Sequence, residues 1–423
     1  MNTLQASHGA DSPYAWTRLW FALALMTIGG SGMYSMAVVL PPLQAEFGIA
    51  RADASLPFTL TMIGFGLGGV LMGRLSDRFG VIVPVLLGSA SLGLGFIGAS
   101  FSHNLLQFTA IHGLLIGVGT SGTFVPLVAD ITLWFTRRRG VAVAVVMSGN
   151  YLAGTVWPPL MQHFIDTSGW RATYVGTGLI CLFAMPLLAL ALRPKPPAIA
   201  GLAPSGARGA SSSPERPLGF SPSQLQGLLC LSGVACCVAM SMPQVHMVAY
   251  CADLGFPAAR GAEMLALMMA FGIVSRLASG WIADHIGGLR TLLLGAALQA
   301  SALALFLPFD GLAALYLVSA LFGLFQGGIV PSYPLIVREY FSPREAGART
   351  GTVIMATLGG MALGGWMPGW IFDMTGSYRA AFVNGIAWSL VTSGIALFLL
   401  FRARPGWRLP ATSGVRAESR HTS

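Results

Sequence analysis

The sequence predicts an all-α membrane protein in which twelve transmembrane helices form two pseudo-symmetric bundles of six. Three observations predict this class. Of the 423 residues, 54% are hydrophobic and only 9% are charged, whereas soluble domains carry about 25% charged residues. Apolar runs of spanning length recur along the chain, and motifs of the first half return in the second. These features exclude a cytoplasmic enzyme and a nucleic-acid-binding protein.

Each predicted helix is an apolar run long enough to cross a bilayer, which takes about 20 helical residues. The twelve runs cover residues 16–43, 54–76, 81–102, 105–134, 140–165, 170–193, 223–252, 258–283, 289–308, 311–337, 347–373 and 378–401. They divide the chain into an N-terminal tail (1–15), a first bundle (16–193), a linker (194–222), a second bundle (223–401) and a C-terminal tail (402–423). The linker is rich in Pro, Ser, Ala and Gly and is predicted to be flexible. The C-terminal tail is predicted to be disordered.

The basic residues predict the orientation of the chain, because Lys and Arg collect in the cytoplasmic loops of inner-membrane proteins. If the N-terminus is inside, 19 of the 24 Lys and Arg residues lie in cytoplasmic segments. Four lie outside, namely Arg51, Arg171, Arg260 and Arg379, and Arg276 lies within a span. A missing or an extra helix would destroy this alternation. We therefore predict a multi-pass protein of a bacterial inner membrane with both termini in the cytoplasm.

The two bundles are related by an internal repeat. Residues 73–80 read GRLSDRFG after the second span, and residues 280–287 read GWIADHIG after the eighth. The repeat places Asp77 and Asp284 207 residues apart. Parallel repeats of six spans recur among secondary transporters.

The loop G-x-L-x-D-R-x-G, its degenerate second copy and the six-plus-six spans resemble the major facilitator superfamily over residues 16–401. Three stretches further resemble the monocarboxylate-porter branch and its bacterial relatives. They are Trp134–Gly140 leading to Ser148-Gly149, Gly169-Trp170-Arg171, and Arg276-x-x-x-Gly280-x-x-x-Asp284. The resemblance implies a transporter in which the two bundles alternate access to a site between them.

Arg276 is the most unusual residue of the predicted spans. A charge near the bilayer centre costs about 2.5–3.5 kcal/mol on insertion scales and is rare. Arg276 lies eight residues before Asp284, about 12 Å along a helix and so near the midplane. The porters that this motif resembles have a carboxylate-binding arginine here, and a guanidinium offers two parallel donors to a carboxylate. We expect Arg276 to bind an anionic substrate; the alternative is a structural arginine satisfied by helix carbonyls or an acid.

Four charged residues near cytoplasmic helix ends are predicted to form a gate: Asp77, Arg78, Asp130 and Asp284. In the superfamily that this loop resembles, the aspartate faces the N-terminal end of a helix from the other bundle, where the macrodipole favours an anion. Arg78 is expected to pair with an acid such as Asp130. These contacts would close the cytoplasmic side. The alternative is a solvated loop turn held by its flanking glycines.

Two interrupted spans indicate where the substrate site is expected. Gly29–Gly32 interrupts the first span and Pro243 interrupts the seventh, its repeat counterpart, and broken spans in corresponding places indicate a binding cavity. Polar and aromatic residues of the first, fifth, seventh and tenth spans are candidates for its wall, and an interhelical hydrogen bond is the alternative role for each. They are Tyr34, Asn150, Tyr151, Trp157, His246, Tyr250, Gln326 and Tyr333.

Together these residues predict a secondary transporter for a small organic anion, most simply a monocarboxylate, acting as a monomer in the lipid bilayer. One alternative is an exporter of a different solute or drug in which Arg276 is structural. The other is a membrane sensor that has lost transport. We expect no enzyme, metal site, cofactor or nucleic-acid partner, because the sequence lacks a nucleophile–base pair, paired carboxylates, a metal-ligand cluster and a nucleotide loop. The five cysteines show no disulfide spacing.

The sequence leaves energy coupling open. Animal monocarboxylate porters of the type that this chain resembles have an aspartate one turn before the arginine, thought to carry the cotransported proton, but Gly272 stands there. The remaining candidates are His246, since a histidine's ordinary pKa of about 6.5 suits proton exchange, and Asp253 at the end of the seventh span. Proton-independent exchange and proton carriage by the substrate's own carboxylate are the alternatives.

Overall fold

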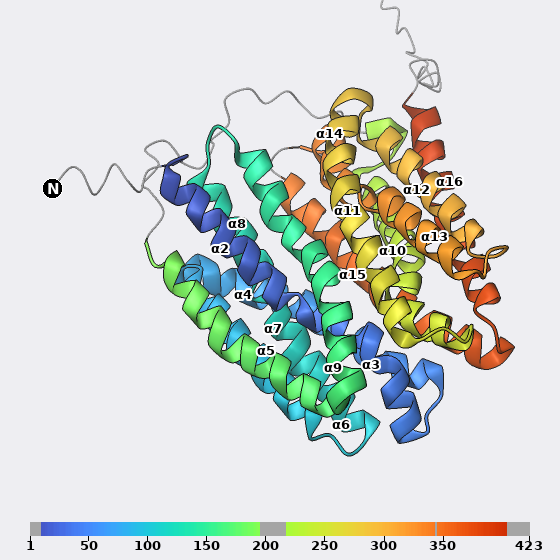
Figure 1. Cartoon of the computed structure of the whole chain (residues 1–423). Coiled ribbons are helices and arrows are strands. Elements are labelled where there is room, and N and C mark those ends of the chain that lie inside the picture. Colours follow the sequence, from blue (N-terminus) through green and yellow to red (C-terminus); the bar gives the residue numbers. More distant parts are fainter. Residues whose placement is uncertain (1–9, 195–216, 343–344, 404–423) are drawn as a thin grey trace, which may run out of the picture.

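The computed structural model describes residues 10–194, 217–342 and 345–403 (Figure 1). Within these ranges the chain is helical apart from short turns and connections, and no strand occurs there. This confirms the predicted all-α class. The predicted linker lies outside the described residues except at its two ends, as do residues 1–9 of the N-terminal tail and residues 404–423 of the C-terminal tail.

The helices fall into two sets, one from each half of the chain. The first set is α2 (Pro13–Gly29), α3 (Ser31–Phe47), α4 (Arg51–Phe79), α5 (Ile82–Ser100), α6 (Leu105–Ile111), the π-helix η1 (His112–Gly117), α7 (Val118–Ser121), α8 (Val125–Trp134), α9 (Arg139–Ala189) and η2 (Leu190–Leu192). The second set is η3 (Pro217–Gly219), α10 (Pro222–Asp253), α11 (Ala258–Ile286), α12 (Gly288–Leu305), α13 (Leu312–Gln326), α14 (Ile329–Tyr340), α15 (Ala346–Thr375) and α16 (Tyr378–Arg402).

Ten helical segments of the described chain are long and apolar enough to cross a membrane. The longest, Gly140–Leu192, has 53 residues and is kinked at Gly169, whose φ of 80° and ψ of 160° are not helical. A straight helix of that length would measure about 80 Å, far more than a hydrocarbon core of about 30 Å. The segment therefore forms both spans predicted at 140–165 and 170–193. The glycine-rich α15, with 30 residues, completes the twelve.

The internal repeat reappears in the backbone geometry. Six glycines with positive φ form three pairs whose members are 207 residues apart: Gly48 and Gly255, Gly80 and Gly287, Gly169 and Gly376. A positive φ is unfavourable for a residue with a Cβ atom and accessible to glycine. The same turns therefore follow equivalent helices in the two halves, which confirms the predicted pseudo-symmetry.

The interruptions predicted in the first and seventh spans have different outcomes. Gly30 separates α2 from α3, and the neighbouring Gly29 allows close packing, because a Cβ atom there would lie 2.0 Å from Oγ1 of Thr123. In contrast, α10 runs through Pro243 without a break. The prediction of a matching break was wrong because a membrane helix tolerates proline where surrounding groups satisfy the freed backbone carbonyls.

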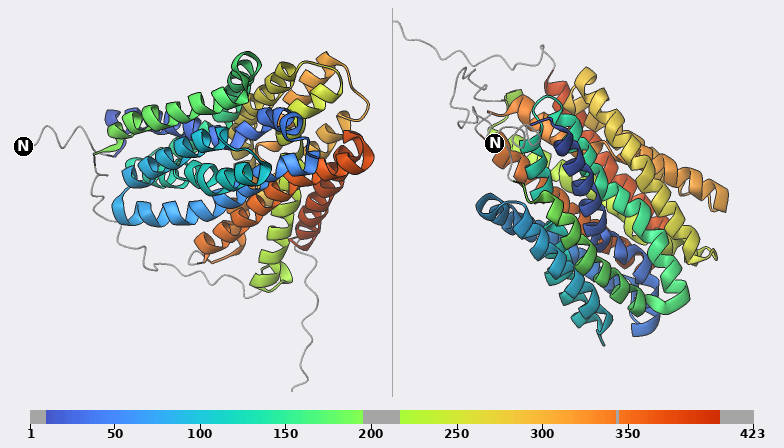
Figure 2. Two further views of the ribbon diagram at one scale, coloured as in Figure 1. Left: turned by 90° about the horizontal axis from the view of Figure 1, so that it is seen from below. Right: turned by 60° about the vertical axis from the view of Figure 1, so that its left-hand side comes forward.

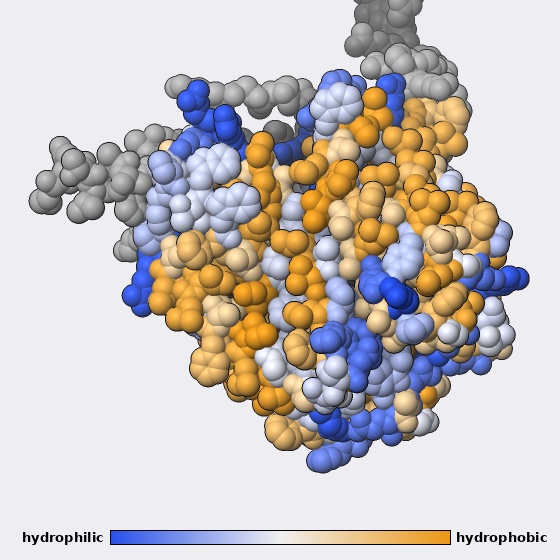
Figure 3. All heavy atoms as spheres, in the orientation of Figure 1, coloured by the Kyte–Doolittle hydropathy of each residue, from blue (hydrophilic) through white to orange (hydrophobic). Residues whose placement is uncertain are grey.

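The two halves lie side by side and meet along long helices. The first set of helices occupies one side of the molecule and the second set the other (Figures 1 and 2); α4 packs against α15, and α9 against α11. Hydrophobic residues predominate on the face shown in Figure 3, and Leu67, Phe183 and Leu390 are more than half exposed, as suits contact with lipid. We name the two ends of the bundle the Arg51 end and the Asp77 end, after residues near the start and the finish of α4.

Candidate functional site

Arg276 lies inside α11, where this helix meets α9 of the other half. It is 18 residues from Ala258 and ten from Ile286, or about 27 Å and 15 Å along the helix. Its side chain is half-buried, its Nε atom is buried without a hydrogen-bond partner, and its guanidinium carbon is 4.6 Å from the centre of the Tyr151 ring. No carboxylate of the described residues forms an ion pair with it. The guanidinium is therefore held within the bundle without a resident counter-charge.

Tyr151 reaches Arg276 because glycines leave room for aromatic rings. A Cβ atom at Gly272, one turn before Arg276, would lie 2.5 Å from Cε1 of Tyr151, and one at Gly154 would lie 2.7 Å from Cζ of Tyr34. Tyr34, on α3, lies close enough to Tyr151 and Arg276 to interact with both electrostatically. Neither tyrosine hydroxyl forms a hydrogen bond within the described part of the chain. The structure thus brings together three residues of the predicted site and places two free hydroxyl groups near the guanidinium.

Two other candidates of the fifth span face α2 and α3. Nδ2 of Asn150 is 3.8 Å from Sδ of Met33, and Nε1 of Trp157 donates a hydrogen bond to the carbonyl oxygen of Thr27 at 2.8 Å. Asn150 and Trp157 are seven residues apart, close to two helical turns, so they share one face of α9, and Tyr151 lies about 100° around the helix. Asn150 and Trp157 therefore join helices of the first half on a different face from Tyr151.

Three candidates of the second half have partners other than Arg276. Oε1 of the buried Gln326 accepts a hydrogen bond from Nε2 of Gln244 at 3.2 Å. The hydroxyl of Tyr333 is 3.1 Å from Oγ of Ser232, within the apolar core of the second half. Tyr250 belongs to an aromatic cluster near the Arg51 end. Gln326 and Tyr333 thus make the interhelical hydrogen bonds that were the alternative role for each.

His246 lies near the Arg51 end of α10 and not at the depth of Arg276. It is seven residues from the end of the helix at Asp253, or about 10 Å. Its Nδ1 is 2.8 Å from the hydroxyl of Tyr378, and its Nε2 is 2.8 Å from the carbonyl oxygen of Gly365. Because a carbonyl oxygen only accepts hydrogen bonds, Nε2 carries a proton and donates it to Gly365. Both ring nitrogens are therefore engaged, and the ring is separated from the Arg276 site.

The structure corrects the predicted partner of Asp130. This carboxylate does not pair with Arg78; it pairs with Arg18 of α2, whose Nε and Nη2 each lie 2.8 Å from a carboxylate oxygen. Only 1% of the Arg18 side chain and 6% of the Asp130 side chain are exposed. Arg18 also donates to the carbonyl oxygen of Leu192 at 3.0 Å and lies 4.5 Å from the Trp134 ring. Arg18 reaches Asp130 because both point into the first half, whereas Arg78 is exposed.

The other predicted gate residues are exposed at the Asp77 end. Asp77 and Arg78 line a pocket of about 760 Å³ that Arg18 and Asp130 also line, so three of the four predicted gate residues lie together, without Asp284. Within the described ranges, neither Asp77 nor Asp284 forms an ion pair or a hydrogen bond. The hydrogen bonds between the two halves of the described chain all start from residues 51–59 of α4. The halves are thus joined by polar contacts at the Arg51 end.

A family model confirms the superfamily that the two related sets of helices indicate. The model of the Major Facilitator Superfamily matches residues 19–312 and 277–419, which together cover most of the chain. The chain belongs to the major facilitator superfamily. The fold agrees with that of a bacterial homologue of the human lysosomal transporter Spinster, which was solved in an inward-facing and occupied conformation. The two structures superpose with a TM-score of 0.68 at 15% sequence identity, and the match covers 93% of this chain and 97% of that chain.

Two similar proteins relate this facilitator to the monocarboxylate transporters. Monocarboxylate transporter 13 of Rattus norvegicus is 28% identical over 357 residues, or 82% of this chain and 78% of the relative. Monocarboxylate transporter 11 of Homo sapiens is 28% identical over 419 residues, or 95% of this chain and 86% of the relative. The predicted resemblance to the monocarboxylate branch of the superfamily is confirmed.

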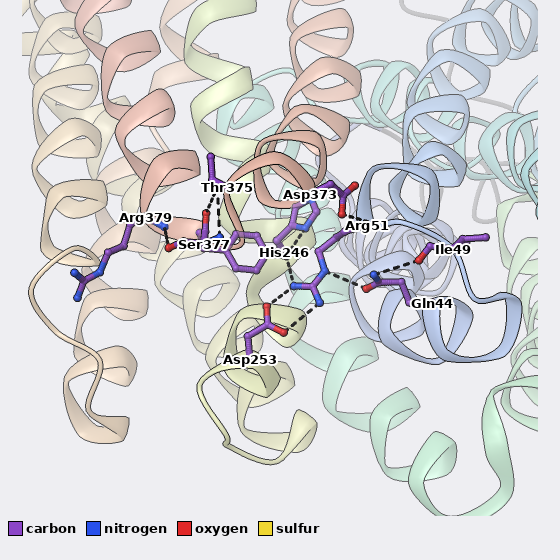
Figure 4. Close-up of polar contacts among 10 residues, drawn as sticks. Gln44, Ile49, Arg51, His246, Asp253, Asp373, Thr375, Ser377 and Arg379 are labelled. Atoms are coloured by element: carbon purple, nitrogen blue, oxygen red, sulfur yellow. Dashed lines mark hydrogen bonds and ion pairs between the residues drawn. The ribbon is translucent and has the colours of Figure 1, made fainter.

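This facilitator has a latch at the Arg51 end that the sequence analysis missed (Figure 4). The Arg51 latch consists of Arg51, Asp253, Asp373 and Tyr378. Both terminal nitrogens of Arg51 donate to the carboxylate of Asp253, and Nη1 lies 3.3 Å from the Tyr378 hydroxyl. The carboxylate of Asp373 accepts from the backbone N–H groups of Arg51 and Ala52 at 2.9 and 2.7 Å, at a helix N-terminus that favours an anion. The latch joins α4 of the first half to α10, α15 and α16 of the second.

The internal repeat contained a signal for the Arg51 latch. Gly48 and Gly255, which are 207 residues apart, form equivalent turns in the two halves. Arg51 follows the first turn and Asp253 precedes the second. Equivalent turns of two pseudo-symmetric halves lie at the same end of the protein. Opposite charges beside such turns can therefore pair between the halves. The sequence analysis used Arg51 only to assign the sides of the membrane and considered Asp253 only as a proton carrier.

Asp253→Asn is expected to open the Arg51 end of this facilitator. The substitution removes a partly exposed ion pair with Arg51, worth about 1 kcal/mol, or a shift of about fivefold in the closed population. The reporter is Ser55→Cys, because Ser55 is buried one turn below the latch, in a background whose five cysteines are replaced. Labelling by a membrane-impermeant maleimide should accelerate about fivefold.

The matched control for the latch is Asp310→Asn. Asp310 pairs with Arg379 within the second half, so its loss removes a similar ion pair without loosening the contact between the halves. The labelling rate of Ser55→Cys should stay unchanged in this variant. Equal rates in the Asp253→Asn and Asp310→Asn variants would show that the Arg51 latch does not hold this end closed.

Tyr151→Leu is expected to weaken substrate binding by this facilitator, whereas Tyr151→Phe is expected to spare it. The Tyr151 ring supports the guanidinium of Arg276 from 4.6 Å, and a cation–π contact contributes about 1 kcal/mol, or about fivefold in affinity. Phenylalanine keeps the ring. The apparent KM for transport distinguishes the two. If the Phe variant is as impaired as the Leu variant, the hydroxyl of Tyr151, and not its ring, contributes to substrate binding.

Proposed function

We propose that this facilitator transports a small organic anion, specifically a monocarboxylate, by alternating access around Arg276. The observation that carries the proposal is the Arg276 guanidinium, which lies between the halves with no acidic partner in the described chain and near the hydroxyls of Tyr34 and Tyr151. Ionisable groups inside a membrane normally pair, because an unpaired charge is costly there. The planar fork of a guanidinium matches a carboxylate. The carboxylate of the substrate is the partner that fits this site.

The rival function, export of a different solute with Arg276 in a structural role, has less support. A structural arginine would be expected to donate to helix carbonyls or to an acid, as Arg18 does to Leu192 and Asp130. Arg276 instead leaves its buried Nε atom without a partner. The two monocarboxylate transporters that are 28% identical to this chain favour the same substrate class. The substrate role of Arg276 is therefore the stronger proposal.

We further propose that the Asp77 end faces the cytoplasm of a bacterial inner membrane and that both termini lie there. The excess of Arg in the segments at this end supports this orientation. In this arrangement, Asp77, Arg78 and Asp284 would close the Asp77 end when the Arg51 latch opens. Because one chain supplies both halves of the site, a monomer suffices for transport. Impermeant thiol labelling of single cysteines at the two ends, in intact cells and in inverted vesicles, tests the orientation.

The test of the substrate class is uptake into proteoliposomes that contain the purified protein and are loaded with unlabelled lactate, so that exchange and one-way uptake are both detected. Radiolabelled lactate and pyruvate should enter faster than into protein-free liposomes, and other monocarboxylates should compete. Lactamide is the matched control, because it has the size of lactate without the charge that Arg276 would bind. Competition by lactamide as strong as by lactate, or uptake of no carboxylate in the panel, would reject the proposed substrate class.

A further inference from the structure

We infer that this facilitator is an obligate exchanger, which trades one monoanion for another across the membrane and performs little one-way transport. The inference rests on the proposed function, because it takes Arg276 as the anion-binding group. It concerns the return of the empty carrier, which decides whether a transporter exchanges its substrate or moves it in one direction. Three features of the site carry the inference. They are the number of charges, the lack of a titratable side chain that could replace the bound anion beside Arg276, and the packing around Gly272.

The described part of the site holds a single positive charge and no negative one. The nearest acids on α11 itself are Asp284 and Glu263, eight and 13 residues from Arg276, or about 12 and 20 Å along the helix. Asp284 is exposed, and Glu263 is held by Arg260. His246 is the one histidine proposed for this site, and both of its ring nitrogens are already engaged. One bound monoanion therefore neutralises the site, whereas a dianion would leave one charge unpaired.

The empty site is expected to resist closure. During alternating access the site passes through a state that is closed at both ends, and the Arg276 guanidinium then loses contact with water. Burying an unpaired charge is strongly unfavourable, and the Tyr151 ring at 4.6 Å offers a weaker partner than a carboxylate. A bound monoanion removes most of this penalty. The loaded carrier can therefore change from one open state to the other, while the empty carrier stays in its open state until another anion binds.

Gly272 explains why the chain has no internal substitute for that anion. A carboxylate one turn before Arg276 would lie on the same face of α11 and could pair with the guanidinium during the return step. A Cβ atom at this position would lie 2.5 Å from Cε1 of Tyr151, so the Tyr151 ring occupies the space that such a side chain needs. The ring supports Arg276 but supplies no carboxylate. The counter-charge must therefore come from an anion bound from either side.

The test compares proteoliposomes loaded with unlabelled lactate and proteoliposomes loaded with buffer alone. Radiolabelled lactate should enter the loaded vesicles at least about tenfold faster, because the penalty for an unpaired arginine exceeds one factor of ten. The rate should not respond to a potassium diffusion potential set with valinomycin, because one monoanion replaces another. Similar rates in both preparations, or rapid entry into unloaded vesicles driven by an inward proton gradient, would overturn obligate exchange and leave the proposed substrate class intact. Uptake in neither preparation would reject the substrate class and, with it, the inference.

A pair of variants tests the cause. In the double variant Gly272→Asp with Tyr151→Ala, the new carboxylate can occupy the space of the ring beside Arg276. Net uptake into unloaded vesicles should then approach the exchange rate, so that the ratio of loaded to unloaded rates falls from about tenfold toward one. The matched variant Gly272→Asn with Tyr151→Ala has the same shape without the charge and should keep the high ratio. A low ratio in both variants would show that packing, and not charge, controls the return step.

Discussion

Arg276→Ala is expected to reduce transport by at least about thirtyfold, because removing one partner of a hydrogen-bonded charge pair costs about 2–5 kcal/mol. The protein should still insert and fold. The substitution breaks no hydrogen bond of Nε, which has no partner, and it relieves the cost of placing a charge inside the bilayer. Initial uptake rates in proteoliposomes and the yield of monodisperse protein measure the two effects separately.

Two further variants make the Arg276 result specific. Arg276→Lys keeps the charge but loses the bidentate fork and should retain little activity. Arg260→Ala is the matched control, because Arg260 lies on the same helix, is exposed and pairs with Glu263 three residues away; its transport should stay close to wild type. Wild-type flux in Arg276→Ala, especially with a reduced yield, would assign Arg276 a structural role and remove the basis of both proposals.

Asp130→Ala is expected to cause a large loss of stability, about 3–5 kcal/mol. The substitution leaves Arg18 with its charge buried, since only 1% of its side chain is exposed, and the carbonyl oxygen of Leu192 does not neutralise it. The midpoint of thermal unfolding in detergent should fall by several degrees. The double variant Arg18→Met with Asp130→Leu should recover most of the loss, because replacing both members of a buried pair by apolar residues is often close to neutral.

The control for the buried pair is Asp284→Ala at the same end of the bundle. Asp284 is exposed and has no ion pair among the described residues, so its loss should change stability by less than about 0.5 kcal/mol. If the unfolding midpoints of Asp130→Ala and Asp284→Ala agree, the Arg18–Asp130 pair does not stabilise the first half. If the Tm of the double variant falls as far as that of Asp130→Ala, the destabilisation comes from lost packing and not from the uncompensated charge of Arg18.

The fold class was predictable because it depends on properties that the order of residues already contains. Length and apolar content set the number of spans, since a helix must satisfy its own backbone in lipid and must be about 20 residues long. The repeat at residues 73–80 and 280–287 predicted two related halves, and the paired glycine turns confirm it. Arg276 was recognisable for the same kind of reason, because a charge inside an apolar run is unusual whatever surrounds it.

The partners of these residues were decided by the tertiary structure alone. A membrane helix that is hydrophobic on all sides carries little periodic signal for which face meets which neighbour, so Tyr151 and Asn150 looked alike although only Tyr151 faces Arg276. In the same way, the sequence analysis paired Asp130 with Arg78, whereas the structure buries Asp130 together with Arg18. The sequence by itself determined the spans, the two related halves and the intramembrane arginine, because these follow from composition and spacing. Which side chains pair depends on helix rotation and depth, which only the packed bundle determines.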